Sequence, residues 1–375
     1  MSSSNNKLSQ YFPVIRARED ISNEIENNEK LKTVFNSWSE EHREEFLEIC
    51  TGNKGVKMLY DTYFKELLNP ETVPERLSAL LSVILKRKVT VKYVLPNDGT
   101  RLGDEMSLII TDIVVELEDH SIANIEVQKI GYAFTGERAS CYSADLLLRQ
   151  YKRVKDKLKE KFTYKNIGSV YTIVFLERSP AVFKEYPEKY VHYFKSTSDT
   201  GLELGMLQNI IFIPVDIFLE KLHNKGIQDE LDAWLTFLGC DEPEYIVELI
   251  NKYPIFKGMY ADLYNMCLNV EGVMNMFSKE LQILDQNTVK YMIDEMQEEL
   301  DNIKDELDTA KSELDTTKTE LDTTKTELDT TKSELDTAKT ELDTANTTIS
   351  NQSKEIADKE KLIAKLQAEL KKHQK

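Results

Sequence analysis

Carboxylates interrupt two short apolar segments of this chain. Asp112 lies in the first segment, and Glu126 lies in the second, two residues before Gln128. Because side chains alternate along a strand, Glu126 and Gln128 would share one face of the second segment. If the two segments pair around the turn "EDHS", Asp112 would lie near Glu126, and two carboxylates that close repel each other unless a cation lies between them. The pattern favours a Mg²⁺ site, which could activate a water and stabilise charge on a phosphodiester.

A simpler interpretation of the same residues stays open. A solvent-facing Glu on a hairpin is common, and Asp112 could cap or end a strand without binding a metal. Zinc is not expected, because the four cysteines are scattered singly, no Cys-x-x-Cys pair occurs, and the five histidines form no ligand spacing with them.

The elements that must position these residues alternate between helices and strands. Residues up to about 70 have helical patterns, and Pro74 opens a further helix with one apolar face. A long helix is expected over 134–161, and a helix-rich segment from about residue 226. Strands are expected at 89–95, 107–117, 122–128, 169–177 and 209–218. This order predicts an α/β protein with a mixed sheet flanked by helices and with helical additions at both ends.

The motif residues resemble those of a known family. Asp112, then "IEVQ", then the helix "ERASCYSADLLLRQY" are similar to the PD-(D/E)XK nuclease superfamily. More narrowly, they resemble the PD-(D/E)XK nuclease family transposases, which are related to recombination-promoting nucleases. In that group an Asp ends one strand and Glu-x-Gln follows on the next. Arg138 and Tyr142 match an Arg and a Tyr four apart on the following helix, and the resemblance covers roughly residues 10–290.

The resemblance implies a restriction-endonuclease-like fold and a metal-dependent DNA endonuclease that uses Mg²⁺ or Mn²⁺. Asp112 and Glu126 match the metal-binding acids, and Gln128 matches the position of the active-site Lys. Glu75, in the helix before the sheet, is the candidate match for an acid that some members carry there. An acid near a helix start is favourable in any protein, so Glu75 has a structural interpretation as well.

Gln128 leaves the catalytic competence of the chain open. A Lys ammonium can orient the attacking water and offset phosphate charge, whereas a Gln amide donates hydrogen bonds but carries no charge. Lys129 is adjacent to Gln128 but is expected on the other face of the strand.

Charge limits how the chain could bind DNA. The net charge is −18, of which residues 301–375 contribute −5. A protein that coats nucleic acid without specificity carries a basic excess, so any contact needs a local basic surface. The segment 149–165 holds eight Lys and Arg residues against two acidic ones. A solvated helix face is the alternative interpretation of that segment. The candidate DNA-binding residues are Arg138, Arg149, Lys152, Arg153 and Lys155.

The last part of the chain is a seven-residue repeat, typified by "ELDTTKT". With Leu or Ile at heptad position a, Ala or Thr falls at d, Lys at e and Glu at g, an arrangement used for interhelical ion pairs. Glu313 and Lys318 have the g-to-e′ offset of neighbouring chains in a parallel coiled coil, whereas Asp308 and Lys311 can pair within one helix. Residues 296–375 are therefore predicted to self-associate. A solitary or disordered tail stays the alternative, because Thr and Ala make a poor core at d.

The sequence predicts a cytoplasmic protein with no membrane contact. Its first residues lack the apolar core of a signal peptide, and no apolar run approaches the ~20 residues needed to span a bilayer. The predicted division is a helical region at 1–70, a nuclease-like core at 71–225, a helical segment at 226–295 and a coiled coil at 296–375.

Three functions fit these observations. The first is a Mg²⁺-dependent DNA endonuclease of a mobile element, oligomerised by its coiled coil. The second is a catalytically inactive nuclease-fold module for binding or assembly, which the Gln, the acidic charge and the tail favour. The third is a purely structural coiled-coil protein, which explains only the tail.

Overall fold

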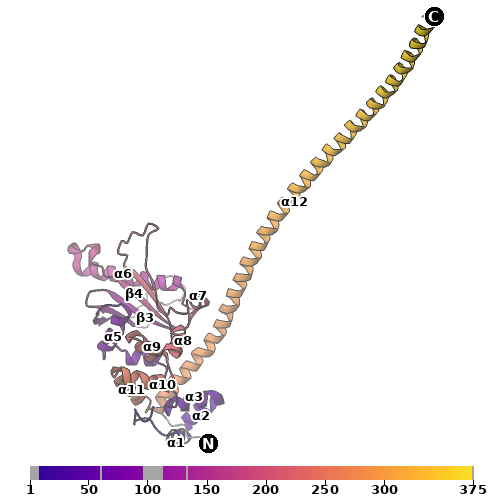
Figure 1. Ribbon diagram of the computed structural model, residues 1–375. Helices are drawn as coiled ribbons and strands as arrows, with labels where there is room; N and C mark the ends of the chain where they lie inside the picture. The colour runs from indigo at the N-terminus through magenta and orange to yellow at the C-terminus, as the bar shows by residue number, and fades with distance from the viewer. Residues whose placement is uncertain (1–7, 60, 96–112, 132–133, 374–375) are drawn as a thin grey trace. The chain divides into compact units, whose positions relative to one another are not determined.

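The computed structural model describes residues 8–59, 61–95, 113–131 and 134–373 (Figure 1). The chain forms two compact units, Met1–Asp294 and Glu295–Lys375, which are described separately below. In the described part of the chain, no helix is both long and apolar enough to cross a membrane.

Within the described residues, one mixed sheet of six strands organises the first unit, in the order β1-β2-β3-β4-β6-β5. Strands β1 to β3 pair antiparallel, β3, β4 and β6 run parallel, and β5 is antiparallel to β6. The strands are β1 (Val91–Val94), β2 (Ile113–Leu117), β3 (Ile122–Ile130), β4 (Val170–Arg178), β5 (His192–Phe194) and β6 (Gln208–Pro214). A mixed sheet flanked by helices confirms the predicted fold class.

Helix α6 (Gly136–Leu158) connects the parallel strands β3 and β4 and packs against β4 and β6 (Figure 1). It begins after Thr135, whose hydroxyl accepts a hydrogen bond from the backbone N–H of Arg138. Two small hydrophobic clusters hold it on the sheet, one around Tyr142 and one around Leu146. The predicted helix over 134–161 is thus present, with 3₁₀ turns at Lys159–Lys161 and Tyr164–Asn166 following it.

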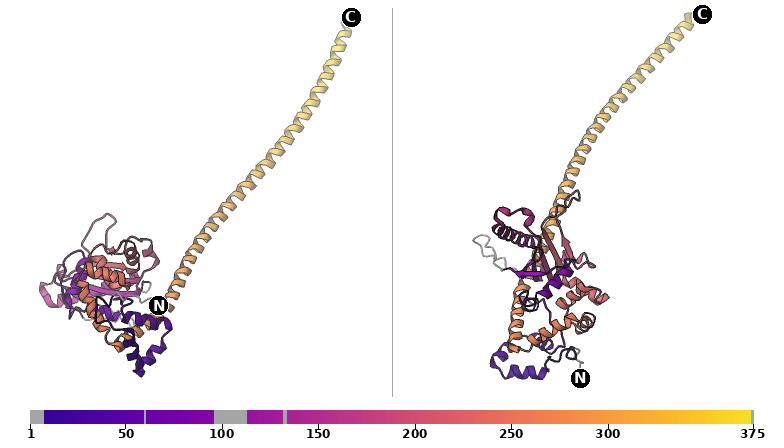
Figure 2. Two further views of the ribbon diagram at one scale, coloured as in Figure 1. Left: turned by 60° about the horizontal axis from the view of Figure 1, so that its bottom comes forward. Right: turned by 90° about the vertical axis from the view of Figure 1, so that its left-hand side faces the viewer.

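Helices from both ends of the unit lie on the side of the sheet opposite α6 and share one large hydrophobic cluster with the sheet. Figure 2 shows the N-terminal helices, in indigo, beside the orange helices that follow residue 240. Aromatic rings join them: the ring centroids of Trp38 and Phe277 are 5.1 Å apart, and those of Phe12 and Tyr264 are also 5.1 Å apart. The helices are α1 (Arg18–Glu26), α2 (Glu29–Ser37), α3 (Glu40–Cys50), α4 (Asp61–Leu67), α5 (Pro74–Ile84), α8 (Val215–Lys225), α9 (Glu230–Gly239), α10 (Pro243–Lys252), α11 (Ile255–Met266) and the start of α12 (Val270–His373).

This large cluster contains residues of all three segments predicted before residue 296. The predicted boundaries near residues 70 and 225 therefore do not separate independent hydrophobic cores, and their meaning as domain limits stays a prediction.

The structure corrects one sequence-based expectation and adds one strand that the sequence did not predict. The apolar run 209–218 is not one strand, because β6 ends at Pro214 and α8 begins at Val215. Asp216 in the first turn of α8 accepts hydrogen bonds from the backbone N–H and the hydroxyl of Ser179, both at 2.9 Å, which fixes this junction. The short strand β5 was not predicted. Of the strand expected at 107–117, residues up to Asp112 lie outside the described part of the chain.

A buried ionic network ties α8 to α9. Asp232 has no exposed surface and accepts hydrogen bonds from the Tyr190 hydroxyl at 2.7 Å and from the Lys221 ammonium at 3.1 and 3.2 Å. The backbone N–H of Gln228 donates a further bond at 2.9 Å. Burial is the main cause that raises the pKa of the Tyr190 phenol, and the hydrogen bond to Asp232 is the second. Tyr190 therefore keeps its proton and donates it in the hydrogen bond to Asp232.

We predict that Asp232→Ala lowers the free energy of unfolding by about 3 kcal/mol, because it leaves the ammonium of Lys221 without its carboxylate. Urea denaturation followed by circular dichroism measures this change. Asp199→Ala, on an exposed segment, is the control and should change stability by less than about 0.5 kcal/mol. Equal stability of the two variants would contradict the prediction.

Candidate active site

Strand β3 lies in the interior of the sheet and has two different faces. Ala123 and Ile125 belong to the large cluster, and Val127 packs against it. Ile122 belongs to a cluster with Leu146 of α6. Because side chains alternate, the even-numbered residues of β3 face α6, and Glu126 and Gln128 are among them.

Glu126 is a charged side chain at an almost fully enclosed position, with 1% of its surface exposed. Its carboxylate accepts a hydrogen bond from the Nδ2 of Asn124 at 2.9 Å, and Asn124 has no exposed surface. Among the described residues, the Oδ1 of Asn124 and the hydroxyl of Thr172, its register partner on β4, lack hydrogen-bond partners. These three polar groups form a strip in the layer between the sheet and α6, and such a strip costs free energy unless it is compensated.

Helix α6 covers this strip. Val174, the register partner of Glu126 on β4, packs in one cluster with Tyr142 of α6. The Nη2 and Nε of Arg138 donate to the Tyr142 hydroxyl at 2.9 and 3.2 Å. The Arg138 guanidinium also lies 4.9 Å from the ring centroid of Phe134. The structure thus brings together the Arg and the Tyr that the sequence matched to the family pattern, on the face of the sheet that carries Glu126.

The other predicted site residues differ in what the structure shows. Asp112 lies outside the described residues, and β2 begins at the next residue, Ile113, whose register partner is Ile125. Gln128 is partly exposed on β3. Glu75 is exposed in the first turn of α5, and the buried residues of α5 belong to the large cluster. The structure therefore places Glu75 on a helix of the opposite face from Glu126, and its catalytic role stays a prediction.

No group of three or more acidic, His or Cys side chains that could hold a metal occurs among the described residues. The carboxylate of Glu126 fits one ligand of a hard divalent cation, and an amide oxygen such as that of Asn124 is chemically suited to the same ion. A second carboxylate would have to come from Asp112.

The predicted DNA-binding residues lie on the second half of α6, apart from Arg138. Arg149 forms an ion pair with Asp145 at 2.8 Å, and Arg153 forms one with Glu116 of β2 at 2.8 Å. Lys152 and Lys155 are exposed. At 1.5 Å per residue, Lys155 is about 20 Å along the helix from Tyr142. The basic segment and the polar strip around Glu126 are thus two separate regions on the α6 side of the sheet.

Asn124 is the residue that the sequence interpretation missed. It lies two positions before Glu126, so strand alternation alone places both side chains on one face. What the sequence does not show is the burial of both side chains and the hydrogen bond between them.

The mixed sheet flanked by helices is consistent with the fold of one class of protein, the PD-(D/E)XK nucleases. The chain belongs to the PD-(D/E)XK nuclease family transposases, because the model of that family matches residues 58–296. This confirms the resemblance found in the sequence. Nucleases of the PD-(D/E)XK type generally use divalent metal ions. Comparison with curated proteins and with solved structures found no match.

We predict that Asn124 and Glu126 are energetically coupled. In a double-mutant cycle of Asn124→Ala, Glu126→Ala and the double variant, urea denaturation should give a coupling free energy of about 1 to 3 kcal/mol, as expected for a buried hydrogen bond to a charged group. Additive effects of the two substitutions would show that the hydrogen bond contributes nothing to stability.

Proposed function

We propose that this chain is a metal-dependent DNA endonuclease of a mobile element, which hydrolyses phosphodiester bonds. Asp112 and Glu126 would hold Mg²⁺ or Mn²⁺, and a cytoplasmic location goes with this proposal. The observation that carries the proposal is the enclosed carboxylate of Glu126 under α6, in a chain that belongs to a nuclease family. Burial of a carboxylate costs several kcal/mol in a packed layer, so a position that served structure alone would favour an apolar side chain.

The residues around this strip have distinct roles in the proposed reaction. A bound divalent ion supplies an activated water and stabilises charge on the phosphodiester. Asn124 holds the carboxylate of Glu126 in place through its hydrogen bond. In this reaction the amide of Gln128 would donate hydrogen bonds to phosphate or water, and Arg138 would add positive charge from α6.

An inactive binding or assembly module is the second candidate function. The observation in its favour is Gln128, which offers no charge where other members of the superfamily carry Lys. Cleavage of DNA separates the two candidates, because the inactive module would keep the fold and lack the reaction.

We predict that the purified full chain nicks supercoiled plasmid with Mg²⁺ or Mn²⁺ and not with EDTA. Asp112→Ala and Glu126→Ala should each reduce the rate at least about 100-fold, because each removes a metal ligand and the charge stabilisation it supports. Gel densitometry of the relaxed and linear forms over time measures the rate.

Glu118→Ala is the matched control, since Glu118 is an exposed acid in the turn between β2 and β3 and should leave the rate unchanged. Absence of cleavage by the folded wild-type protein in either metal would transfer the proposal to the inactive module. Cleavage that survives Glu126→Ala would reject the assigned site.

We also infer that residues 296–375 form a parallel coiled coil between copies of this chain. Within the described residues of α12, the a-position side chains are open, and Leu321 and Leu328 are each 66% exposed. The intrahelical pair predicted from the repeat is present, with Lys311 and Asp308 3.2 Å apart. A partner helix would bury the leucine stripe and leave the Glu and Lys rows to form interhelical pairs.

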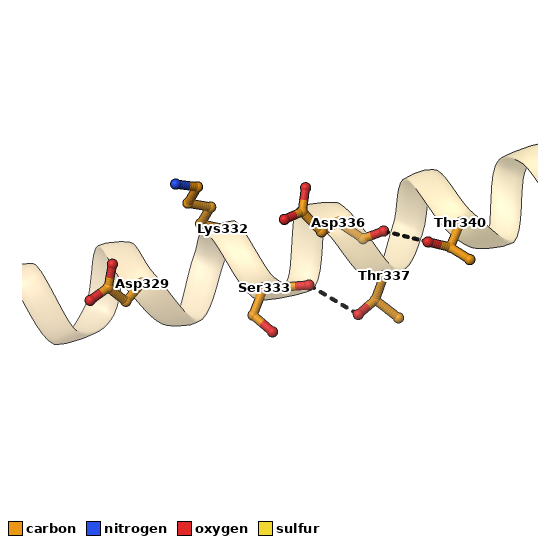
Figure 3. A pocket seen from close by; sticks show the side chains of 6 residues that line it. All are labelled: Asp329, Lys332, Ser333, Asp336, Thr337 and Thr340. Carbon is orange, nitrogen blue, oxygen red and sulfur yellow. Dashed lines mark hydrogen bonds between the residues drawn. The ribbon is translucent and has the colours of Figure 1, made fainter.

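The threonines at position d are polar residues, but their hydroxyl groups need no partner in this interface. The hydroxyls of Thr317, Thr324 and Thr331 each donate to the carbonyl oxygen four residues earlier at 2.9 Å, so their polar atoms are already paired within the helix. Figure 3 shows the same bond for Thr337 and Thr340. Only the methyl group of each Thr at d then needs to pack in the interface, although such bonds weaken and bend helices slightly.

We predict that the full chain is an oligomer and that the double substitution Leu321→Asn, Leu328→Asn shifts it toward the monomer, because both side chains occupy position a. Light scattering coupled to size-exclusion chromatography measures the mass. The matched control is Thr319→Asn, Thr326→Asn, which places the same residue type at the outward position f and should leave the mass unchanged. A wild-type protein that runs as a monomer at all accessible concentrations would reject the coiled coil.

A further inference from the structure

The C-terminal end of α6 carries an aromatic platform formed by Tyr151, Phe162 and Tyr164. The ring planes of Tyr151 and Tyr164 are nearly parallel, at an interplanar angle of 10° and a centroid distance of 6.1 Å. Phe162 meets both rings edge-on, with centroids 5.5 Å away in each case. Tyr164 is nevertheless 74% exposed, so its ring contributes little to a core and leaves most of its surface open to solvent.

The platform lies within the most basic segment of the chain. Lys152, Lys161 and Lys165 are exposed on the same short segment as the rings. The ammonium of Lys155 is 5.2 Å from the ring centroid of Tyr151 and donates a hydrogen bond to the Tyr151 hydroxyl at 2.9 Å. Unlike Arg149 and Arg153, Lys152 and Lys155 form no ion pair with a carboxylate among the described residues.

We propose that this platform binds single-stranded DNA, with an unpaired base stacked on the ring of Tyr164 and the phosphates held by the surrounding lysines. Lysines alone would bind any phosphate backbone, duplex included. An exposed aromatic ring adds binding only when a base face is free, and a duplex does not offer one. The proposal deepens the endonuclease function and rests on it for the choice of DNA, because it names an unpaired strand or end as the preferred part of the substrate.

The position of the platform fits that role. Leu158, the last residue of α6, lies about 24 Å along the helix from Tyr142, which covers the layer of Glu126. A strand bound at the platform would therefore contact the protein far from the phosphodiester at the carboxylate strip. Tyr164 would position the substrate and would take no part in the reaction.

Fluorescence anisotropy of a labelled 20-residue oligothymidine, titrated with the full-length protein in EDTA, tests the proposal without requiring cleavage. Wild-type protein should bind the oligonucleotide more tightly than a blunt hairpin duplex of equal charge. Tyr164→Ala should weaken oligothymidine binding about tenfold, the usual contribution of one base–aromatic stack, with a much smaller effect on the duplex. Tyr164→Phe should bind like wild type, because it keeps the ring and removes only the hydroxyl.

Tyr186→Ala is the matched control, since Tyr186 is 54% exposed outside the basic segment and should leave affinity unchanged. Three outcomes would overturn the proposal. Tyr164→Ala could bind oligothymidine as tightly as wild type, or Tyr164→Phe could bind it as weakly as Tyr164→Ala. In the third, Tyr164→Ala would weaken binding of both DNA forms equally. Binding that depends on Tyr164 in a protein that cleaves nothing would uphold the platform while rejecting the endonuclease.

Discussion

The carboxylate of Glu126 is the constraint around which this sheet is built. Strand β3 pairs with β2 on one side and β4 on the other, and both of its faces are covered, by the large cluster and by α6. A side chain at such a position is normally apolar, because an ionised group there loses its hydration. Asn124 repays part of this cost, and its own Oδ1 then lacks a partner among the described residues. The strip is therefore polar to a degree that packing alone does not explain, which is expected of a functional site rather than of a core.

One face of the sheet carries most of the apolar packing, and the other face carries the candidate site. The large cluster on one face joins helices from both ends of the unit, and rings such as Trp38 and Phe277 pack there although 239 positions apart in sequence numbering. The buried Asp232 network fixes α8 and α9 on the same side of the molecule. The α6 face has only small clusters around its polar strip. A fold with most of its apolar burial on one face can tolerate unpaired polar atoms on the other, because the large cluster supplies most of the hydrophobic stabilisation.

Local patterns in the sequence predicted much of the sheet, and physical reasons set their limits. Alternation placed Glu126 and Gln128 on one face, and the long helix expected over 134–161 corresponds to α6. The prediction of one strand over 209–218 was wrong because a continuous apolar stretch has no period that separates a strand from the helix after it. The pair of Arg149 with Asp145 has helical i,i+4 spacing, whereas the pair of Arg153 with Glu116 exists only because β2 lies beside α6 in the fold. The burial of Asn124 against Glu126 is likewise a consequence of tertiary packing that no local pattern encodes.

The charge of the chain links the tail to the nuclease unit in the proposed function. A protein of net charge −18 repels DNA at long range, and carboxylates partly neutralise its basic segment through Arg149 and Arg153. A single copy would therefore bind DNA weakly, through a few lysines and one aromatic platform. Joining two copies through a coiled coil makes the second contact intramolecular and raises the effective concentration of the second unit without any new contact to DNA. It also supplies a second active site, which cleavage of both strands requires when one site cuts one strand. DNA binding by an oligomer, rather than by a single chain, is therefore the arrangement that fits all three features. These are the acidic net charge, the short basic segment and the long repeat.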